Sequence, residues 1–157
     1  MAVFTAVEAL NMALRIEQNG QTFYTAAAER ARQPEVKAVL DDLAVQEQRH
    51  YRAFQRMLDR LAVEPSSLTV PGLDEYDLYV QTALDNALFA GPDKALAALD
   101  EAGEEKQALR IALGFEKDTL LFFYDLRDMM REAERSTVDE IIREEKAHVR
   151  RLALLLR

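Results

Sequence analysis

The chain has 157 residues, enough for one domain with a sizeable core, and its composition (49% apolar, 31% charged) suits a helical protein better than a disordered or membrane chain. The formal charge of −8 argues against nucleic acid as a partner. The absence of cysteine excludes disulfides, thiolate nucleophiles, iron–sulfur clusters and a rubredoxin-type iron site in this chain.

The N-terminus predicts no targeting segment. It carries no basic residue before Glu8, and Glu8 itself lies where the apolar core of a signal peptide would be needed. No stretch approaches the roughly 20 apolar residues of a membrane span. We therefore expect a cytoplasmic protein with no membrane partner.

Residues 2–61 are predicted to form a helical hairpin. In its first helix, about residues 2–31, apolar side chains recur at steps of three and four, which is the period of one helix face. A single carboxylate, Glu17, interrupts the middle of that face. Pro34 suits the first turn of the second helix, because its missing N–H group has no partner there anyway. The short link makes the two helices antiparallel neighbours.

The second helix, about residues 34–61, carries one carboxylate and one imidazole inside its apolar face. The apolar positions of this face are Val36, Leu40, Leu43, Phe54, Met57 and Leu61. Glu47 and His50 occupy its centre, and residues three apart on a helix lie on the same side. Both side chains should therefore project into the core.

Residues 62–103 separate this hairpin from the next one. We expect a loop over residues 62–76, a modest helix over residues 77–90, and a short helical segment that begins at Pro92. A connection of this length is typical of a crossover that runs along a bundle, so the helices on either side of it should be parallel.

Residues 104–157 are predicted to form a second helical hairpin. Its first helix, about residues 104–131, has Glu116 at the centre of an apolar face. Its second helix continues to the C-terminus, with Glu145 and His148 at the centre of a similar face.

The two hairpins are internal repeats of one another. A shift of 98 residues aligns the two Glu-x-x-His motifs, and a shift of 99 residues aligns Glu17 with Glu116. Ser136 or Thr137 is the expected N-cap of the last helix. Each hairpin thus carries a glutamate on its first helix and Glu-x-x-His on its second.

Ionised carboxylates in a core need counter-charges, because burying an isolated charge is very unfavourable. No Lys or Arg occupies the matching inward positions. Two divalent cations would balance four carboxylates and leave both histidines neutral as nitrogen ligands. Carboxylate and imidazole ligands suit iron or manganese better than a structural zinc site. The predicted ligands are Glu17, Glu47, His50, Glu116, Glu145 and His148.

These motifs resemble the rubrerythrin family of ferritin-like di-iron proteins over essentially the whole chain. The residues that carry the resemblance are Glu17 with Gly20, Phe23 and Tyr24, the two Glu-x-x-His motifs, Glu116-Lys117-Asp118 before an aromatic run, and Glu144-Glu145-Lys146. The resemblance implies an all-α, ferritin-like four-helix bundle in a single domain, residues 1–157. It also implies two iron ions as cofactor, with manganese or zinc as substitutes.

The resemblance further assigns roles to individual residues. Glu47 and Glu145 would bridge the two ions, and Glu17 and Glu116 would each bind one of them. Each histidine would hold one ion. Tyr24 would donate a hydrogen bond that orients a carboxylate.

The chain departs from the family pattern at two positions. Thr119 stands where peroxidase-type members carry a further carboxylate, and Phe123 stands where they carry a tyrosine, with Tyr124 displaced by one residue. A ligand exchange that uses the extra glutamate is therefore not expected. Asp118 and Glu144 adjoin ligands in sequence, and we expect them at the surface or just behind the ligands.

The function implied is an oxidoreductase that reduces H₂O₂ or O₂, with electrons from a separate donor protein or from Fe²⁺. The alternatives are a non-catalytic iron-handling protein and a structural bundle. Relatives of this kind form homodimers, some with exchanged helices, and the connection over residues 62–103 would permit such an exchange.

Overall fold

The computed structural model describes residues 5–63 and 91–157 of the chain, and this part contains five α-helices. The helices are α1 (Ala6–Arg30), α2 (Pro34–Val63), α4 (Pro92–Ala102), α5 (Glu105–Met129) and α6 (Glu132–Leu155). The predicted helix over residues 77–90, and most of the predicted loop before it, lie outside the described residues. The predicted short segment at Pro92 is α4.

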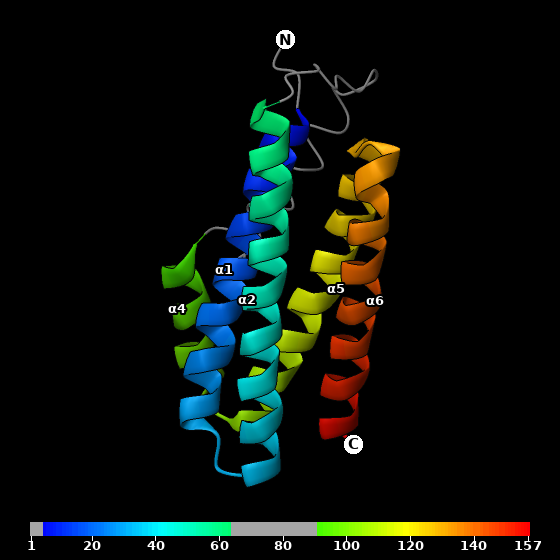
Figure 1. Ribbon diagram of the computed structural model, residues 1–157. Coiled ribbons are helices and arrows are strands. Elements are labelled where there is room, and N and C mark those ends of the chain that lie inside the picture. The colour runs from blue at the N-terminus through cyan, green and yellow to red at the C-terminus, as the bar shows by residue number, and fades with distance from the viewer. Residues whose placement is uncertain (1–4, 64–90) are drawn as a thin grey trace.

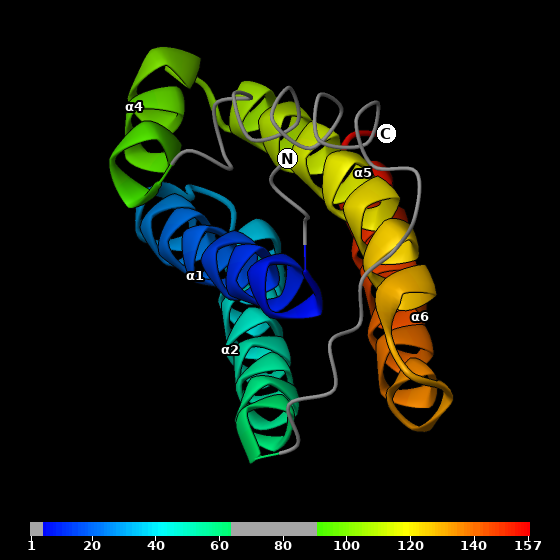
Figure 2. The same cartoon turned by 90° about the horizontal axis from the view of Figure 1, so that it is seen from above.

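The four long helices form two antiparallel pairs, α1 with α2 and α5 with α6 (Figure 1). Helices α2 and α5 run in the same direction, as the long connection between them predicted. Figure 2 shows the two pairs side by side, with α4 against α1 and close to the start of α5. The prediction of an all-α four-helix bundle is confirmed.

Helix α1 begins with a capping box. The Thr5 hydroxyl accepts a hydrogen bond from the Glu8 backbone N–H (3.2 Å), and the Glu8 carboxylate accepts one from the Thr5 N–H (2.7 Å). This exchange satisfies two backbone donors that the first turn leaves without partners. Local sequence therefore sets where the helix starts.

Helix α6 begins earlier than predicted, so the expected N-cap at Ser136 or Thr137 is wrong. Both residues lie inside the helix, which starts at Glu132. Acidic residues in its first turn interact favourably with the helix dipole. The Arg135 Nε donates to the backbone oxygen of Met130 (3.0 Å) and ties the turn to the end of α5.

Two apolar clusters fill the interior, one toward each end of the bundle. The first cluster includes Leu10, Ile16, Phe54, Phe123 and Ile141, and the second includes Phe23, Leu43, Leu109, Ala112 and Leu152. On every long helix, the predicted metal-binding residues fall between residues of the first cluster and residues of the second. The predicted metal-binding residues thus form a polar layer between the two apolar clusters, away from both ends of the bundle.

Within the described residues, no helix combines the length and apolar character that a membrane crossing would require.

Candidate metal centre

The structure brings all six predicted ligands together in one buried layer. They are Glu17 from α1, Glu47 and His50 from α2, Glu116 from α5, and Glu145 and His148 from α6. Each is at most 2% exposed. Each hairpin supplies three of the six side chains. They form two overlapping groups that share Glu47 and Glu145, and each group contains one histidine.

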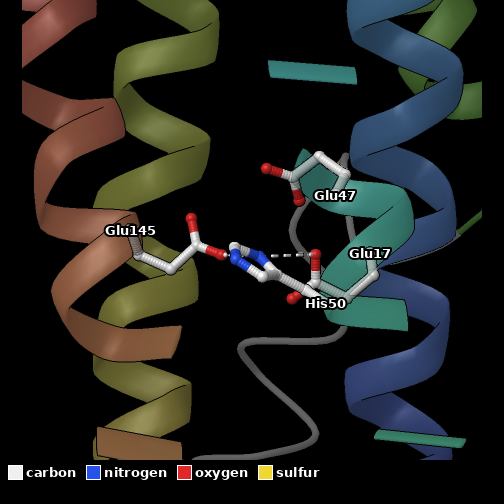
Figure 3. Close-up of side chains that lie close together, drawn as sticks. All are labelled: Glu17, Glu47, His50 and Glu145. Carbon is white, nitrogen blue, oxygen red and sulfur yellow. Dashed lines mark ion pairs between the residues drawn. The ribbon is translucent and has the colours of Figure 1, made fainter. Parts of the chain in front are cut away.

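The first group surrounds His50. Its Nδ1 atom lies 2.8 Å from Glu145 Oε1 and 3.6 Å from Glu17 Oε2. Figure 3 shows Glu145 reaching toward the imidazole from α6, with Glu17 and Glu47 on the side of α1 and α2. Two hairpins must therefore meet for this group to exist.

The second group surrounds His148. Its Nδ1 atom lies 2.8 Å from Glu145 Oε2, 3.2 Å from Glu47 Oε1 and 3.5 Å from Glu116 Oε1. The rings of His50 and His148 stack with their centroids 5.6 Å apart and their planes at 21°. One carboxylate, that of Glu145, thus faces the two histidines with its two different oxygens.

The inward atoms of this layer approach one another without hydrogen bonding. Among the residues that the structure describes, the buried atoms with no hydrogen-bond partner include both oxygens of Glu17, Glu47 and Glu145, Glu116 Oε2 and the Nδ1 atoms of both histidines. Ligands about 2.1 Å from a shared ion lie roughly 3 to 4 Å from one another. The observed separations of 2.8 to 3.6 Å are close to that spacing. Oxygen and imidazole nitrogen donors without sulfur suit iron or manganese.

The outward nitrogen of each histidine has an acceptor from the opposite hairpin. His50 Nε2 lies 2.6 Å from Glu144 Oε2, and His148 Nε2 lies 2.8 Å from Gln46 Oε1. An acceptor at Nε2 holds the proton there, so Nδ1 keeps the lone pair that a metal needs. Both Nδ1 atoms therefore point into the layer, where a neutral imidazole could bind a metal through them.

Sequence reasoning placed Glu144 close to a ligand but missed Gln46. The signal was available, because both residues directly precede the glutamate of a Glu-x-x-His motif and align under the same shift. Asp118, the other acidic neighbour of a candidate ligand, is exposed.

Tyr24 also contacts the layer. Its buried hydroxyl donates a hydrogen bond to Glu116 Oε1, which lies on the opposite hairpin. Thr119 is fully buried, and its hydroxyl has no hydrogen-bond partner within the described residues. Phe123 packs against Phe54 with ring centroids 5.1 Å apart. Tyr24 therefore supports a glutamate of this layer, whereas Phe123, at the aligned position of the other hairpin, makes only an apolar contact.

Gly20 lets α1 approach the layer closely. A Cβ atom at this position would lie 2.9 Å from Glu47 Oε2 and 3.1 Å from Phe115 Cε1. Contacts below 3.0 Å force a displacement. Glycine therefore leaves Glu47 and Phe115 in place, and its role here is one of space, since its backbone is ordinary helix.

The carboxylates of the layer differ in their preference for a proton. Burial raises the pKa of Glu17, Glu47 and Glu116 well above the usual value, and neighbouring carboxylates raise it further. Burial also opposes ionisation of Glu145, but the close approach of His148 and His50 to its two oxygens outweighs it and lowers its pKa. Glu145 is thus the most readily ionised member of the layer.

The pKa values of both histidines are raised, which favours their charged forms. Burial disfavours their charged forms, yet the close approach of Glu145 and the other surrounding carboxylates raises the pKa of His50 to about 9. The close approach of Glu116, Glu145 and Glu47 likewise raises the pKa of His148 against the effect of burial. Without metal, protons supply the positive charge that this layer requires, and bound cations would displace them.

Comparison with known proteins places the chain in a family. The rubrerythrin family model matches residues 8–156. The chain belongs to the rubrerythrin family. A solved structure from Thermotoga maritima, assigned provisionally as a ferritin-like diiron-carboxylate protein, covers 100% of this chain with 97% of its own length, at 26% identity and a TM-score of 0.70. No curated protein sequence matches the chain.

Membership confirms the resemblance seen in the motifs, and the structural similarity confirms the predicted ferritin-like fold. A buried cluster of glutamates and histidines in a rubrerythrin-family bundle suits a di-iron site. The chain itself contains no cysteine and hence no rubredoxin-type site.

Proposed function

We propose that the layer holds two iron ions and that the protein is an oxidoreductase that reduces H₂O₂ or O₂. Glu17 and His50 would hold one ion, Glu116 and His148 would hold the other, and Glu47 and Glu145, which belong to both groups, would serve both ions. The observation that carries this proposal is Glu145, whose two oxygens each lie 2.8 Å from the Nδ1 atom of a different histidine. Such a carboxylate is placed to serve two ions at once.

Iron supplies the redox chemistry, because two ferrous ions together provide the two electrons that reduce a peroxide. The chain supplies the surroundings. The two apolar clusters keep water from the layer, and four carboxylates match the charge of the cations. Tyr24 holds a proton on its hydroxyl, where burial raises its pKa, and so remains a hydrogen-bond donor to Glu116 at neutral pH.

A second candidate function is iron handling without catalysis. Thr119 and Phe123 favour it, because they replace a carboxylate and a tyrosine that peroxidase-type relatives carry near the metals. Thr119 lacks the anionic carboxylate of that position, and Phe123 lacks a phenolic proton to donate. In that case the protein oxidises and retains its iron.

The proposal includes a source of electrons and a setting. With no cysteine for an iron–sulfur or rubredoxin-type centre in this chain, a separate donor protein or Fe²⁺ itself delivers the electrons. We place the protein in the cytoplasm as a homodimer, in keeping with the family resemblance, and helix exchange between subunits is part of that expectation.

The test is to load the protein with Fe²⁺ without oxygen and to titrate it with H₂O₂ and, separately, with O₂. We expect two iron ions per chain, faster oxidation by H₂O₂ than by O₂, and repeated turnover when an external reductant is supplied. The measurements are iron content and the ultraviolet–visible spectrum.

Each other outcome decides against a part of the proposal. A single round of oxidation with retained iron, despite excess reductant, would establish the iron-handling function instead. Iron that reacts with neither oxidant, or stoichiometric zinc from cells grown with ample iron, would overturn the oxidoreductase assignment.

A further inference from the structure

The two histidines are held by different outer partners, although each belongs to a group with three glutamates. Each Nε2 atom faces a side chain from the residue that precedes a Glu-x-x-His glutamate on the opposite hairpin. For His50 this side chain is the carboxylate of Glu144, and for His148 it is the amide of Gln46. The repeat therefore conserves the contact and changes its charge.

At His50 the carboxylate touches the imidazole directly. Glu144 Oε2 lies 2.6 Å from His50 Nε2, and Glu144 Oε1 accepts a hydrogen bond from Arg49 (3.0 Å). A negatively charged acceptor forms a stronger hydrogen bond than a neutral one and draws the N–H proton away from the ring. The Nδ1 atom of His50 therefore becomes a more basic ligand.

At His148 an amide separates the imidazole from the nearest carboxylate. Gln46 Oε1 lies 2.8 Å from His148 Nε2, and the Gln46 amide group donates to Asp42 (2.6 Å). Asp42 in turn accepts from Arg151 (2.6 Å). A carboxylate and an arginine thus lie behind each histidine, but at His148 the carboxylate of Asp42 is separated from the ring by the Gln46 side chain. Because the Gln46 amide nitrogen donates to Asp42, the amide is oriented with its carbonyl oxygen toward the histidine.

We propose that Glu144 and Gln46 make the two metal positions unequal, so that the position of His50 fills with a divalent cation before the position of His148. This inference rests on the proposed two-ion site, but not on its redox activity. The Glu144 carboxylate makes the His50 imidazole more basic and adds a nearby negative charge, whereas the Gln46 amide has neither effect on His148. The preferred position is thus encoded by one residue in each hairpin.

Arg49 opposes this preference only weakly. Its side chain is 60% exposed, whereas that of Glu144 is 27% exposed, so the pair lies on the water side of the contact. Water screens an exposed ion pair strongly. The contact between Glu144 and His50, whose side chain is 2% exposed, is screened far less.

The chain offers a direct readout, because it contains only two histidines. Protein with ¹⁵N-labelled histidine gives one set of ring signals for each metal position, and an H148Q variant assigns them. Zn²⁺ is added in steps up to two equivalents while both sets are followed by NMR. In the unaltered protein, the His50 signals should shift during the first equivalent and the His148 signals during the second.

Two substitutions of equal shape then test the cause. E144Q should weaken the first binding step about tenfold and remove the order of filling, as loss of an outer partner typically costs 10–100-fold in affinity. The double variant E144Q/Q46E keeps the net charge and exchanges the two partners, so the His148 signals should now shift first. Circular dichroism checks that each variant keeps its helical content.

Parallel shifts of both histidines in the unaltered protein would overturn the inference, as would His50 filling first in the double variant. Because Zn²⁺ carries no redox chemistry, a protein that fails to reduce peroxide can still fill in the expected order. If Zn²⁺ moves neither set of signals, both the two-ion site and this inference fail.

Discussion

The two hairpins of this protein carry the same candidate ligands on different supports. Helices α1 and α2 supply Glu and Glu-x-x-His, and helices α5 and α6 supply the same set under a shift of 98 or 99 residues. The residues behind the ligands do not repeat. Gly20 aligns with Thr119, Tyr24 with Phe123 and Gln46 with Glu144.

The difference separates what a metal pair requires from what tunes it. Four carboxylates would balance the charge of two divalent cations and two imidazoles would add neutral donors, and each hairpin supplies half of this set. Tyr24, Gln46 and Glu144 each contact a candidate ligand of the other hairpin, so each can change without removing a donor. The ligand layer is therefore symmetric in composition, whereas its hydrogen bonds are not.

The largest effect should come from removing either shared carboxylate. In E145Q or E47Q, an amide replaces the anion that both metal groups share, so the affinity for two Zn²⁺ ions should fall more than about 100-fold, beyond the range for outer partners. If the hairpins are equivalent at the ligands, the two variants should lose metal to a similar extent. Competition with a chelator measures this affinity.

Glu134 provides the matched control on α6. It is buried, but it pairs with Arg60 (3.2 Å) and belongs to neither metal group. E134Q should lower the free energy of unfolding by about 1 kcal/mol and leave the metal affinity unchanged. Loss of metal in E134Q, or its retention in E145Q, would contradict the assignment of the shared ligands.

An intermediate loss of metal affinity is expected from a change at Gly20, because α1 approaches Glu47 closely there and the aligned residue of the other hairpin is Thr119. In G20A the new Cβ would displace Glu47, because it would lie 2.9 Å from Oε2. We expect about a tenfold loss of Zn²⁺ affinity, the size typical of a disturbed ligand orientation. The same chelator competition measures it.

Gly114 on α5 is the control, since it is exposed and a Cβ there would meet nothing within 4 Å. G114A should raise the free energy of unfolding by roughly 0.5–1 kcal/mol, because alanine favours helix over glycine, with no change in metal affinity. Equal affinity in G20A and the unaltered protein would show that Glu47 relaxes freely and that the close approach is not required.

Much of the candidate site could be predicted from the helix period. A carboxylate or imidazole at the centre of an apolar face must enter the core, and the structure brings all six such residues together. The parallel course of α2 and α5 followed from the length of the connection. These features depend on the spacing of residues along the chain, which can be read directly from the sequence.

The outer contacts could not be predicted in the same way. Gln46 and Glu144 lie on the half-exposed flank of their helices, where a polar residue needs no partner. Their contacts depend on how closely the two hairpins approach and turn toward each other. The start of α6 was missed for a related reason, because a tight link after Met130 replaced the capping residues that local preference favours.

The smallest effect on metal binding should come from Tyr24, which contacts a glutamate of only one candidate metal group. Y24F removes the hydroxyl that donates to Glu116 and leaves its counterpart Phe123 untouched. The free energy of unfolding should fall by about 1–3 kcal/mol, because a buried acceptor loses its donor. Denaturant unfolding of the metal-free protein measures this change.

In the zinc-loaded protein the same variant should alter one position selectively. Glu116 belongs to the group of His148 and not to that of His50, so only the His148 ring signals should shift relative to the unaltered protein. Y124F is the control, because Tyr124 is 41% exposed one residue beyond the aligned position. Equal shifts at both histidines in Y24F would mean that the bridging glutamates couple the positions so tightly that differences between the hairpins do not act locally.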